Sequence, residues 1–119
     1  MKKTLILGAT TNPTRYAYLA ANRLVAYGHQ IINVGIKSGE VAGQPLEKPI
    51  HIYNDIDTIT LYLGPQNQTE YYNYILQTKP KRVIFNPGTE NAELESLAIQ
   101  NGIEVLEACT LVLLSTNQY

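Results

Sequence analysis

The sequence predicts an α/β protein in which five parallel strands form a three-layer, doubly wound sheet of order 3-2-1-4-5. Short apolar runs alternate with segments of helical spacing along the 119 residues, and Gly or Pro-Gly turns separate them. Strands that alternate with helices form parallel sheets with helices on both faces and right-handed crossovers. The length fits one domain, so we expect residues 1–119 to fold together.

The first 36 residues have the pattern of one strand–helix–strand unit. An apolar run at 4–7 ends at Gly8, and a helix is expected over 15–27, followed by Gly28 at its C-terminal stop. A second apolar run at 31–36 completes a unit of about the minimum length. The helix is indicated by one apolar face, which is formed by Ala17, Ala20, Ala21, Leu24 and Val25.

The remaining elements follow the same rhythm after an irregular segment at 37–57, in which only 50–53 looks extended. Apolar runs predict three more strands and helical spacing predicts two more helices: strands 58–63, 82–85 and 103–106, and helices 68–78 and 91–101. An apolar run at 111–114 predicts a short extended tail. A loop as long as 37–57 is uncommon in a compact domain and is often functional.

Composition excludes several classes of protein. The net charge of −1 argues against a dedicated nucleic-acid-binding or polybasic membrane-binding protein. The one cysteine, Cys109, excludes an internal disulfide framework and a CxxC motif, and we expect it to be a small core residue. No apolar run approaches roughly 18 residues and no signal-peptide pattern is present, so we expect a cytoplasmic protein.

The predicted sheet directs attention to the turns after its strands. In open parallel sheets ligands bind outside the carboxyl ends of the strands, which selects residues 8–15, 35–38, 63–67 and 86–91. All four segments are rich in Gly, Pro, Asn and Thr, as any strand-to-helix turn is. Four such turns around one crevice favour a ligand site over four unrelated turns.

The first turn has the features of an anion site. Gly8 permits close approach of a ligand, and the following helix offers free N–H groups and a partial positive charge. Arg15, a cation at a helix start, is explained if an anion lies between it and the helix. The turn has one glycine where the dinucleotide fingerprint GxGxxG has three.

The end of the second strand discriminates between nucleotides. An NAD site requires an acidic residue there, whereas this chain has Lys37 and Ser38. A cation and a hydroxyl suit a phosphorylated ribose, as in NADP or in the 3′-phosphate of coenzyme A. A solvated lysine on a mobile loop explains Lys37 equally well.

No arrangement of residues indicates catalysis or metal binding. The two histidines, His29 and His51, are isolated, and no metal-ligand spacing, GxSxG turn or P-loop is present. We therefore expect no catalytic residues and no metal ligands, and the sequence favours a binding protein over an enzyme.

The ordered motifs resemble a known family. The segment Gly8-Ala9-Thr10-Thr11-Asn12-Pro13-Thr14-Arg15-Tyr16 resembles the G-A-S-x-x-P-x-R-x turn of the small stand-alone CoA-binding domain proteins. These proteins are Rossmann-like and similar to the CoA-binding domain of the succinyl-CoA synthetase α subunit. The resemblance continues in order through residues 28–29, 57–65, 86–91 and 107–109.

The resemblance implies a non-catalytic protein that binds coenzyme A or an acyl-CoA. It assigns the site as follows: Gly8, Ala9, Thr10, Thr11 and Arg15 would hold the pyrophosphate, Lys37 and Ser38 would flank the phosphorylated adenosine, Leu63, Gly64 and Pro65 would line the nucleotide cleft, and Asn86, Pro87, Gly88 and Thr89 would lie along the pantetheine arm. The chain departs from the family after the second strand, where Gly35-Ile36-Lys37 replaces the usual Asn-Pro.

Two other interpretations remain open at this point. The cation after the second strand also fits an NADP-binding oxidoreductase or redox-sensing regulator. A protein that kept the fold without a ligand could use the tyrosine-rich segment 71–76 as an interface, for a homo-oligomer or another protein partner.

Overall fold

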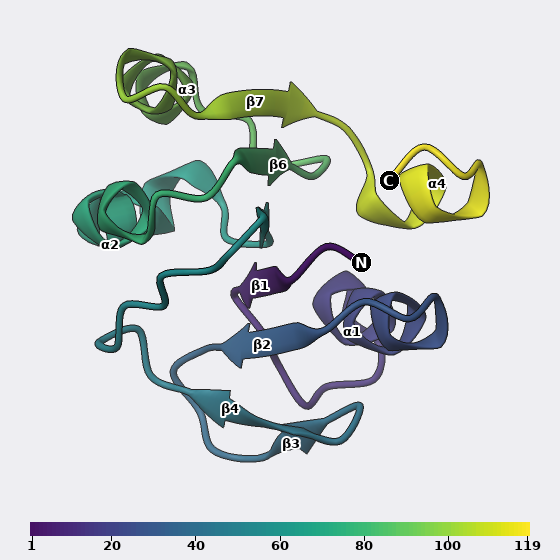
Figure 1. The fold of residues 1–119 in the computed structure, drawn as a ribbon. Helices are drawn as coiled ribbons and strands as arrows, with labels where there is room; N and C mark the ends of the chain where they lie inside the picture. Colours follow the sequence, from purple (N-terminus) through teal and green to yellow (C-terminus); the bar gives the residue numbers. More distant parts are fainter.

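The computed structural model describes residues 1–119 as one mixed sheet with helices on both faces (Figure 1). The strands are β1 (Thr4–Leu7), β2 (Ile31–Val34), β3 (Glu40–Val41), β4 (Gln44–Glu47), β5 (Thr58–Leu61), β6 (Arg82–Phe85) and β7 (Glu104–Glu107). The α-helices are α1 (Tyr16–Ala26), α2 (Tyr72–Thr78), α3 (Ala92–Gln100) and α4 (Thr110–Ser115), and two 3₁₀ turns, Pro65–Asn67 and Thr69–Tyr71, precede α2.

The sheet has the order β3-β4-β2-β1-β5-β6-β7 and is parallel except for the β3–β4 pair. The expected α/β class with a mostly parallel sheet is confirmed, and the expected count of five strands is wrong. The two missed strands form a hairpin in the irregular segment 37–57. The sequence conceals β4 because it contains Pro45 and mostly exposed side chains, and only Leu46 and Glu47 pair with β2.

The predicted order 3-2-1-4-5 is also wrong, for the same reason. It placed segment 58–63 outside the second strand, whereas β5 pairs with the other side of β1, from Thr4↔Thr58 to Leu7↔Leu61. The edge position next to β2 belongs to β4. With β4 counted, the six parallel strands follow the order 3-2-1-4-5-6 of the classic doubly wound sheet.

Alternating side chains of the buried strands divide the core into two layers. Leu5 and Leu7 of β1 face a cluster that includes Ile75 of α2 and Leu94 of α3. Ile6 faces the opposite way, into a cluster built on α1 that also contains Leu114 of α4. Figure 1 shows α2 and α3 together on one face of the sheet and α1 and α4 on the other.

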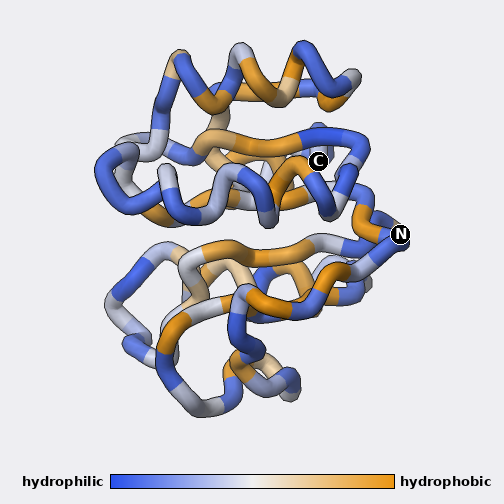
Figure 2. The backbone as a smooth tube through the Cα atoms, turned by 90° about the vertical axis from the view of Figure 1, so that its left-hand side faces the viewer, coloured by the Kyte–Doolittle hydropathy of each residue, from blue (hydrophilic) through white to orange (hydrophobic).

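Hydropathy along the backbone follows this division. The strands are the most apolar segments, and the helices alternate between hydrophobic and hydrophilic turns (Figure 2). All side chains of β1, β5 and β6 are buried, as expected for strands covered on both faces, although β5 alternates Thr with Ile and Leu.

Three local expectations were wrong. The apolar run 111–114 lies in α4 and not in an extended tail, because an apolar run of four residues does not distinguish a strand from a buried helical turn. Residues 50–53 form no strand. The helix predicted over 68–78 begins as 3₁₀ turns and becomes α-helical only at Tyr72.

None of the helices has both the length and the apolar composition that a membrane-spanning segment needs.

Candidate functional site

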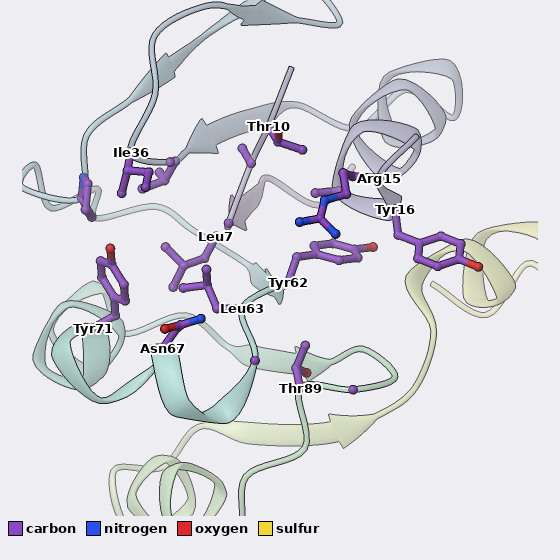
Figure 3. Close-up of a pocket in the computed structure, with 18 of the residues that line it drawn as sticks. Leu7, Thr10, Arg15, Tyr16, Ile36, Tyr62, Leu63, Asn67, Tyr71 and Thr89 are labelled. Carbon is purple, nitrogen blue, oxygen red and sulfur yellow. The ribbon is translucent and has the colours of Figure 1, made fainter. Parts of the chain in front are cut away.

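One cavity of about 870 Å³ lies at the carboxyl ends of β1, β2, β5 and β6. Most of its lining residues come from the four turns that the sequence selected, and its volume is within the roughly 300–1,000 Å³ of typical ligand pockets. Figure 3 shows Leu7 and Leu63 in the middle of the cavity, Ile36 and Tyr71 toward one end, and Arg15 and Tyr62 toward the other.

The fold brings most of the predicted site residues together around this cavity. Ten of them line it: Gly8, Ala9, Thr10, Arg15, Lys37, Leu63, Gly64, Pro87, Gly88 and Thr89. Four predicted residues are not part of the lining: Thr11, Ser38, Pro65 and Asn86.

Two of these four have structural contacts instead. A Cβ placed on Gly39 would lie 2.5 Å from Cγ2 of Thr11, so the Thr11 methyl group packs against the loop after β2. The Asn86 side chain is buried, where its Nδ2 donates to Thr60 Oγ1 (2.7 Å) and Leu61 O (3.0 Å) and its Oδ1 accepts from the backbone N–H of Thr110 (2.9 Å). Asn86 therefore fastens β6 to β5 and α4.

The start of α1 leaves backbone donors without partners beside the cavity. Arg15 occupies the N-cap position without a capping hydrogen bond from its side chain, and the first turn contains no acidic residue. No hydrogen bond uses the N–H groups of Tyr16 and Ala17, and both residues line the cavity. Unpaired donors and the positive end of a helix dipole form an anion-binding site, and the Arg15 guanidinium adds a full charge.

Gly8 lines the cavity and also has a packing role that the sequence did not indicate. Its backbone φ is +97°, and a Cβ there would lie 3.1 Å from the carbonyl carbon of Tyr62. The N–H groups of Gly8 and Ala9 both donate to Val34 O at 3.0 Å. Glycine is therefore needed at this position for the close packing of β1 against the end of β5, and the N–H groups of Gly8 and Ala9 are not free for a ligand.

The end of the cavity opposite Arg15 contains Ile36 and Tyr71, and Lys37, the second cation of the lining, directly follows Ile36 in the chain. Ile36 is 70% exposed at this end, with Pro49 and the half-buried Tyr71 among the other lining residues. Lys37 and Glu70 are exposed and supply one charge of each sign. A ligand that spans the cavity would meet a cation near each end.

Tyr62 is a lining residue that the sequence analysis did not select. Its Oη is buried and has no hydrogen-bond partner, and the hydroxyls of Thr60 and Thr110 bond to each other at 2.8 Å. Burial raises the pKa of Tyr62 to about 12, so the hydroxyl keeps its proton at neutral pH. Its ring, and not its hydroxyl, is the part available to the cavity.

Three further lining residues were given no role from the sequence: Gly35 and Asn67, which lie within the selected turns 35–38 and 63–67, and Tyr16, which lies outside the selected turns. Gly35 had a signal, since a glycine at the end of a strand indicates close approach, and a Cβ there would lie 2.5 Å from Ala9 O. Asn67 and Tyr16 carry no pattern that distinguishes them from other turn residues.

Comparison with known proteins identifies the family. Residues 2–115 match the family model described as CoA binding domain. The chain belongs to this CoA-binding domain family. The match covers nearly the whole chain, which confirms the resemblance found in the motifs.

Solved structures support the same fold for this CoA-binding domain. The crystal structure of an uncharacterized protein shares 58% sequence identity over 100% of this chain and 98% of its own, with a TM-score of 0.98. A protein from Thermus thermophilus is 20% identical over 99% of this chain and 90% of its own, with a TM-score of 0.87. A hypothetical protein from Pyrococcus horikoshii OT3 is 26% identical over 93% and 79%, with a TM-score of 0.83. The search of curated proteins gave no match.

Proposed function

We propose that this CoA-binding domain protein binds coenzyme A or an acyl-CoA in the cavity, with the pyrophosphate at the start of α1. The observation that carries the proposal is the uncapped N-terminus of α1 with Arg15 beside it, which opens into the cavity of a chain whose family is described as CoA binding. A diphosphate is the part of coenzyme A that needs such a combination of free N–H groups and a cation.

The other lining residues suggest places for the remaining parts of this ligand. With the pyrophosphate at α1, Lys37 at the opposite end is available to the 3′-phosphate of the adenosine. Gly88 and Thr89 of the turn after β6 are available to the pantetheine arm. The lining supplies charges, hydroxyls and apolar walls, and we propose binding without a chemical step.

The alternatives have no comparable support. The NADP interpretation depends on Lys37 alone, and the first turn lacks two of the three glycines of the dinucleotide fingerprint. No observation favours a protein that kept the fold and lost its ligand.

Thermal unfolding with CoA, acetyl-CoA, dephospho-CoA, NAD and NADP tests the proposal. A ligand at 100 times its Kd stabilises the folded state by about 2.7 kcal/mol, which raises Tm by several degrees for a protein of this size. We expect CoA to raise Tm more than NADP does, and NAD to leave it unchanged. A larger shift with NADP, or no shift with any of the five compounds, would contradict the proposal.

A further inference from the structure

Gln68 is a fully buried polar side chain that connects two walls of the cavity without lining it. It lies between the two 3₁₀ turns that follow β5. Its Nε2 donates one hydrogen bond to Leu63 O and one to Thr89 O, each at 2.8 Å. Leu63 follows β5 and Thr89 follows β6, and both residues line the cavity.

The orientation of the Gln68 amide is set by the N-cap of α3. Asn91 Oδ1 accepts from the backbone N–H groups of Glu93 (3.1 Å) and Leu94 (3.3 Å), which fixes the oxygen of this amide toward the helix. Asn91 Nδ2 therefore points the other way, where it donates to Gln68 Oε1 at 2.8 Å and to Tyr72 Oη at 2.9 Å. With its oxygen held by Asn91, Gln68 must turn its NH₂ group toward the two carbonyls.

Each hydrogen of the Gln68 NH₂ group then has one carbonyl to bind, so the pair of turns is held at a fixed separation. Buried polar groups that are fully satisfied in this way give a single arrangement, and reversing one amide places oxygen against oxygen. We propose that Asn91 and Gln68 form an amide relay that positions the Leu63 and Thr89 walls for ligand binding. The relay deepens the proposed function and depends on it for its effect on affinity.

The variant that isolates the relay is Asn91→Asp. Aspartate is as good an N-cap as asparagine, so α3 keeps its cap. It has no NH₂ group, and its second oxygen faces Gln68 Oε1. The Gln68 amide then rotates, and its own oxygen turns toward Leu63 O and Thr89 O. The matched control is Ala92→Asp, which adds the same charge one residue later at an exposed position without contact to Gln68.

The first measurement is CoA affinity by calorimetry well below the Tm of each protein. We expect Asn91→Asp to raise the Kd for CoA about tenfold and to lower Tm by several degrees, because Leu63 O and Thr89 O both lose their donor. Ala92→Asp should leave Kd within about twofold of the wild type. Gln68→Met removes the relay from its other end, and on the fraction that folds it should raise Kd by at least as much as Asn91→Asp. An unchanged Kd in Asn91→Asp would overturn the proposal.

A ligand-free readout separates this proposal from the proposed function. Backbone amide NMR spectra of the Asn91→Asp variant should change in both 62–67 and 86–90, because both turns lose a donor. Changes confined to the turn beside α3 would overturn the relay. If the wild type does not bind CoA, the proposed function fails, and these spectra still decide whether Asn91 and Gln68 position the two walls.

Discussion

The two ends of the sheet differ in whether their polar groups have hydrogen-bond partners within the chain. At the amino ends of the strands, the buried Arg82 donates from Nε to Thr58 Oγ1 (2.7 Å) and from Nη2 to Tyr119 O (3.2 Å), and its guanidinium lies 4.4 Å from the centre of the Tyr119 ring. The Tyr119 hydroxyl completes the cluster with a 2.6 Å hydrogen bond to Thr4 Oγ1. This arginine is enclosed, and its partners belong to the same chain.

At the carboxyl ends, Arg15 is exposed and makes no hydrogen bond through its side chain. The N–H groups of Tyr16 and Ala17 beside it are also unpaired. An arginine with partners in the chain contributes to stability, whereas one without partners beside a cavity is available to a ligand. The comparison supports a role of Arg82 in folding and the proposed role of Arg15 in ligand binding.

Replacement of Arg82 should have the largest effect on stability. Arg82→Met removes the hydrogen bonds to Thr58 and Tyr119 and the contact with the Tyr119 ring, and we expect the free energy of unfolding to fall by about 2–4 kcal/mol. Chemical denaturation measures this loss. CoA affinity at low temperature should be unchanged, and a weakened affinity of the folded variant would show that the two ends of the sheet are not separate.

Two buried tyrosines allow a further comparison, between a hydroxyl that has a hydrogen-bond partner and one that has none. Burial raises the pKa of both Tyr62 and Tyr74 to about 12, but only Tyr74 has a partner, since its Oη donates to His51 O at 2.9 Å. We expect Tyr74→Phe to lower the free energy of unfolding by about 1 kcal/mol and Tyr62→Phe to leave it unchanged or raise it by up to about 1 kcal/mol. Equal losses in the two variants, measured by denaturation, would contradict the assignment of Tyr62.

Replacement of Lys37 tests whether the second cation of the cavity contributes to CoA affinity. Because Lys37 is exposed, Lys37→Ala should weaken CoA binding by less than about 1 kcal/mol, with no effect on the binding of dephospho-CoA, which lacks the 3′-phosphate. Lys81→Ala, an exposed lysine outside the cavity, is the control. An equal loss of affinity for CoA and dephospho-CoA would contradict the proposed contact between Lys37 and the 3′-phosphate.

The smallest expected effect is the pH dependence of stability that His29 causes at the amino ends of the strands. Burial, with the N-terminal amino group, Lys2 and Arg82 nearby, lowers the pKa of His29 below its usual 6.5, and the Lys2 backbone N–H donates to His29 Nδ1 at 3.0 Å. The unfolded chain therefore takes up a proton first as the pH falls. The stability that neutral His29 contributes is complete above pH 6.5 and is lost as the pH falls through the lowered pKa.

Comparison with His29→Asn isolates this effect, since asparagine offers an oxygen to the Lys2 N–H. Between pH 7.5 and pH 5, Tm should fall more in the wild type than in the variant. Parallel curves for the two proteins would show that protonation of His29 does not affect stability.

The sequence predicted those strands and helices whose own pattern of apolar residues indicates which side chains are buried. Strand 82–85 is correct to the residue, and α1 differs from its predicted bounds by one residue at each end. The β3–β4 hairpin was missed because its residues are mostly exposed and its position depends on the edge of β2, where Asn33 Nδ2 donates to Val41 O and Gln44 O. Such an element is held by partners distant in the sequence.

The candidate site shows the same limit. The rule that ligands bind at the carboxyl ends of parallel strands found the four turns, and ten of the fourteen predicted residues line the cavity. Gln68 and Asn86 are polar residues in turns, and nothing in the sequence separates them from solvent-exposed turn residues. Five of their hydrogen bonds join them to partners more than twenty residues away: Thr89 and Asn91 for Gln68, and Thr60, Leu61 and Thr110 for Asn86.

The central claim, that Arg15 and the start of α1 hold the ligand anion, is tested most directly by calorimetric titration of CoA into Arg15→Ala. The control is Arg23→Ala, an exposed arginine in the last turn of the same helix and outside the cavity. We predict that Arg15→Ala weakens CoA binding by about 1–3 kcal/mol, the range for a charge-assisted hydrogen bond, and that Arg23→Ala binds CoA like the wild type. Equal CoA affinity in Arg15→Ala and the wild type would contradict the claim.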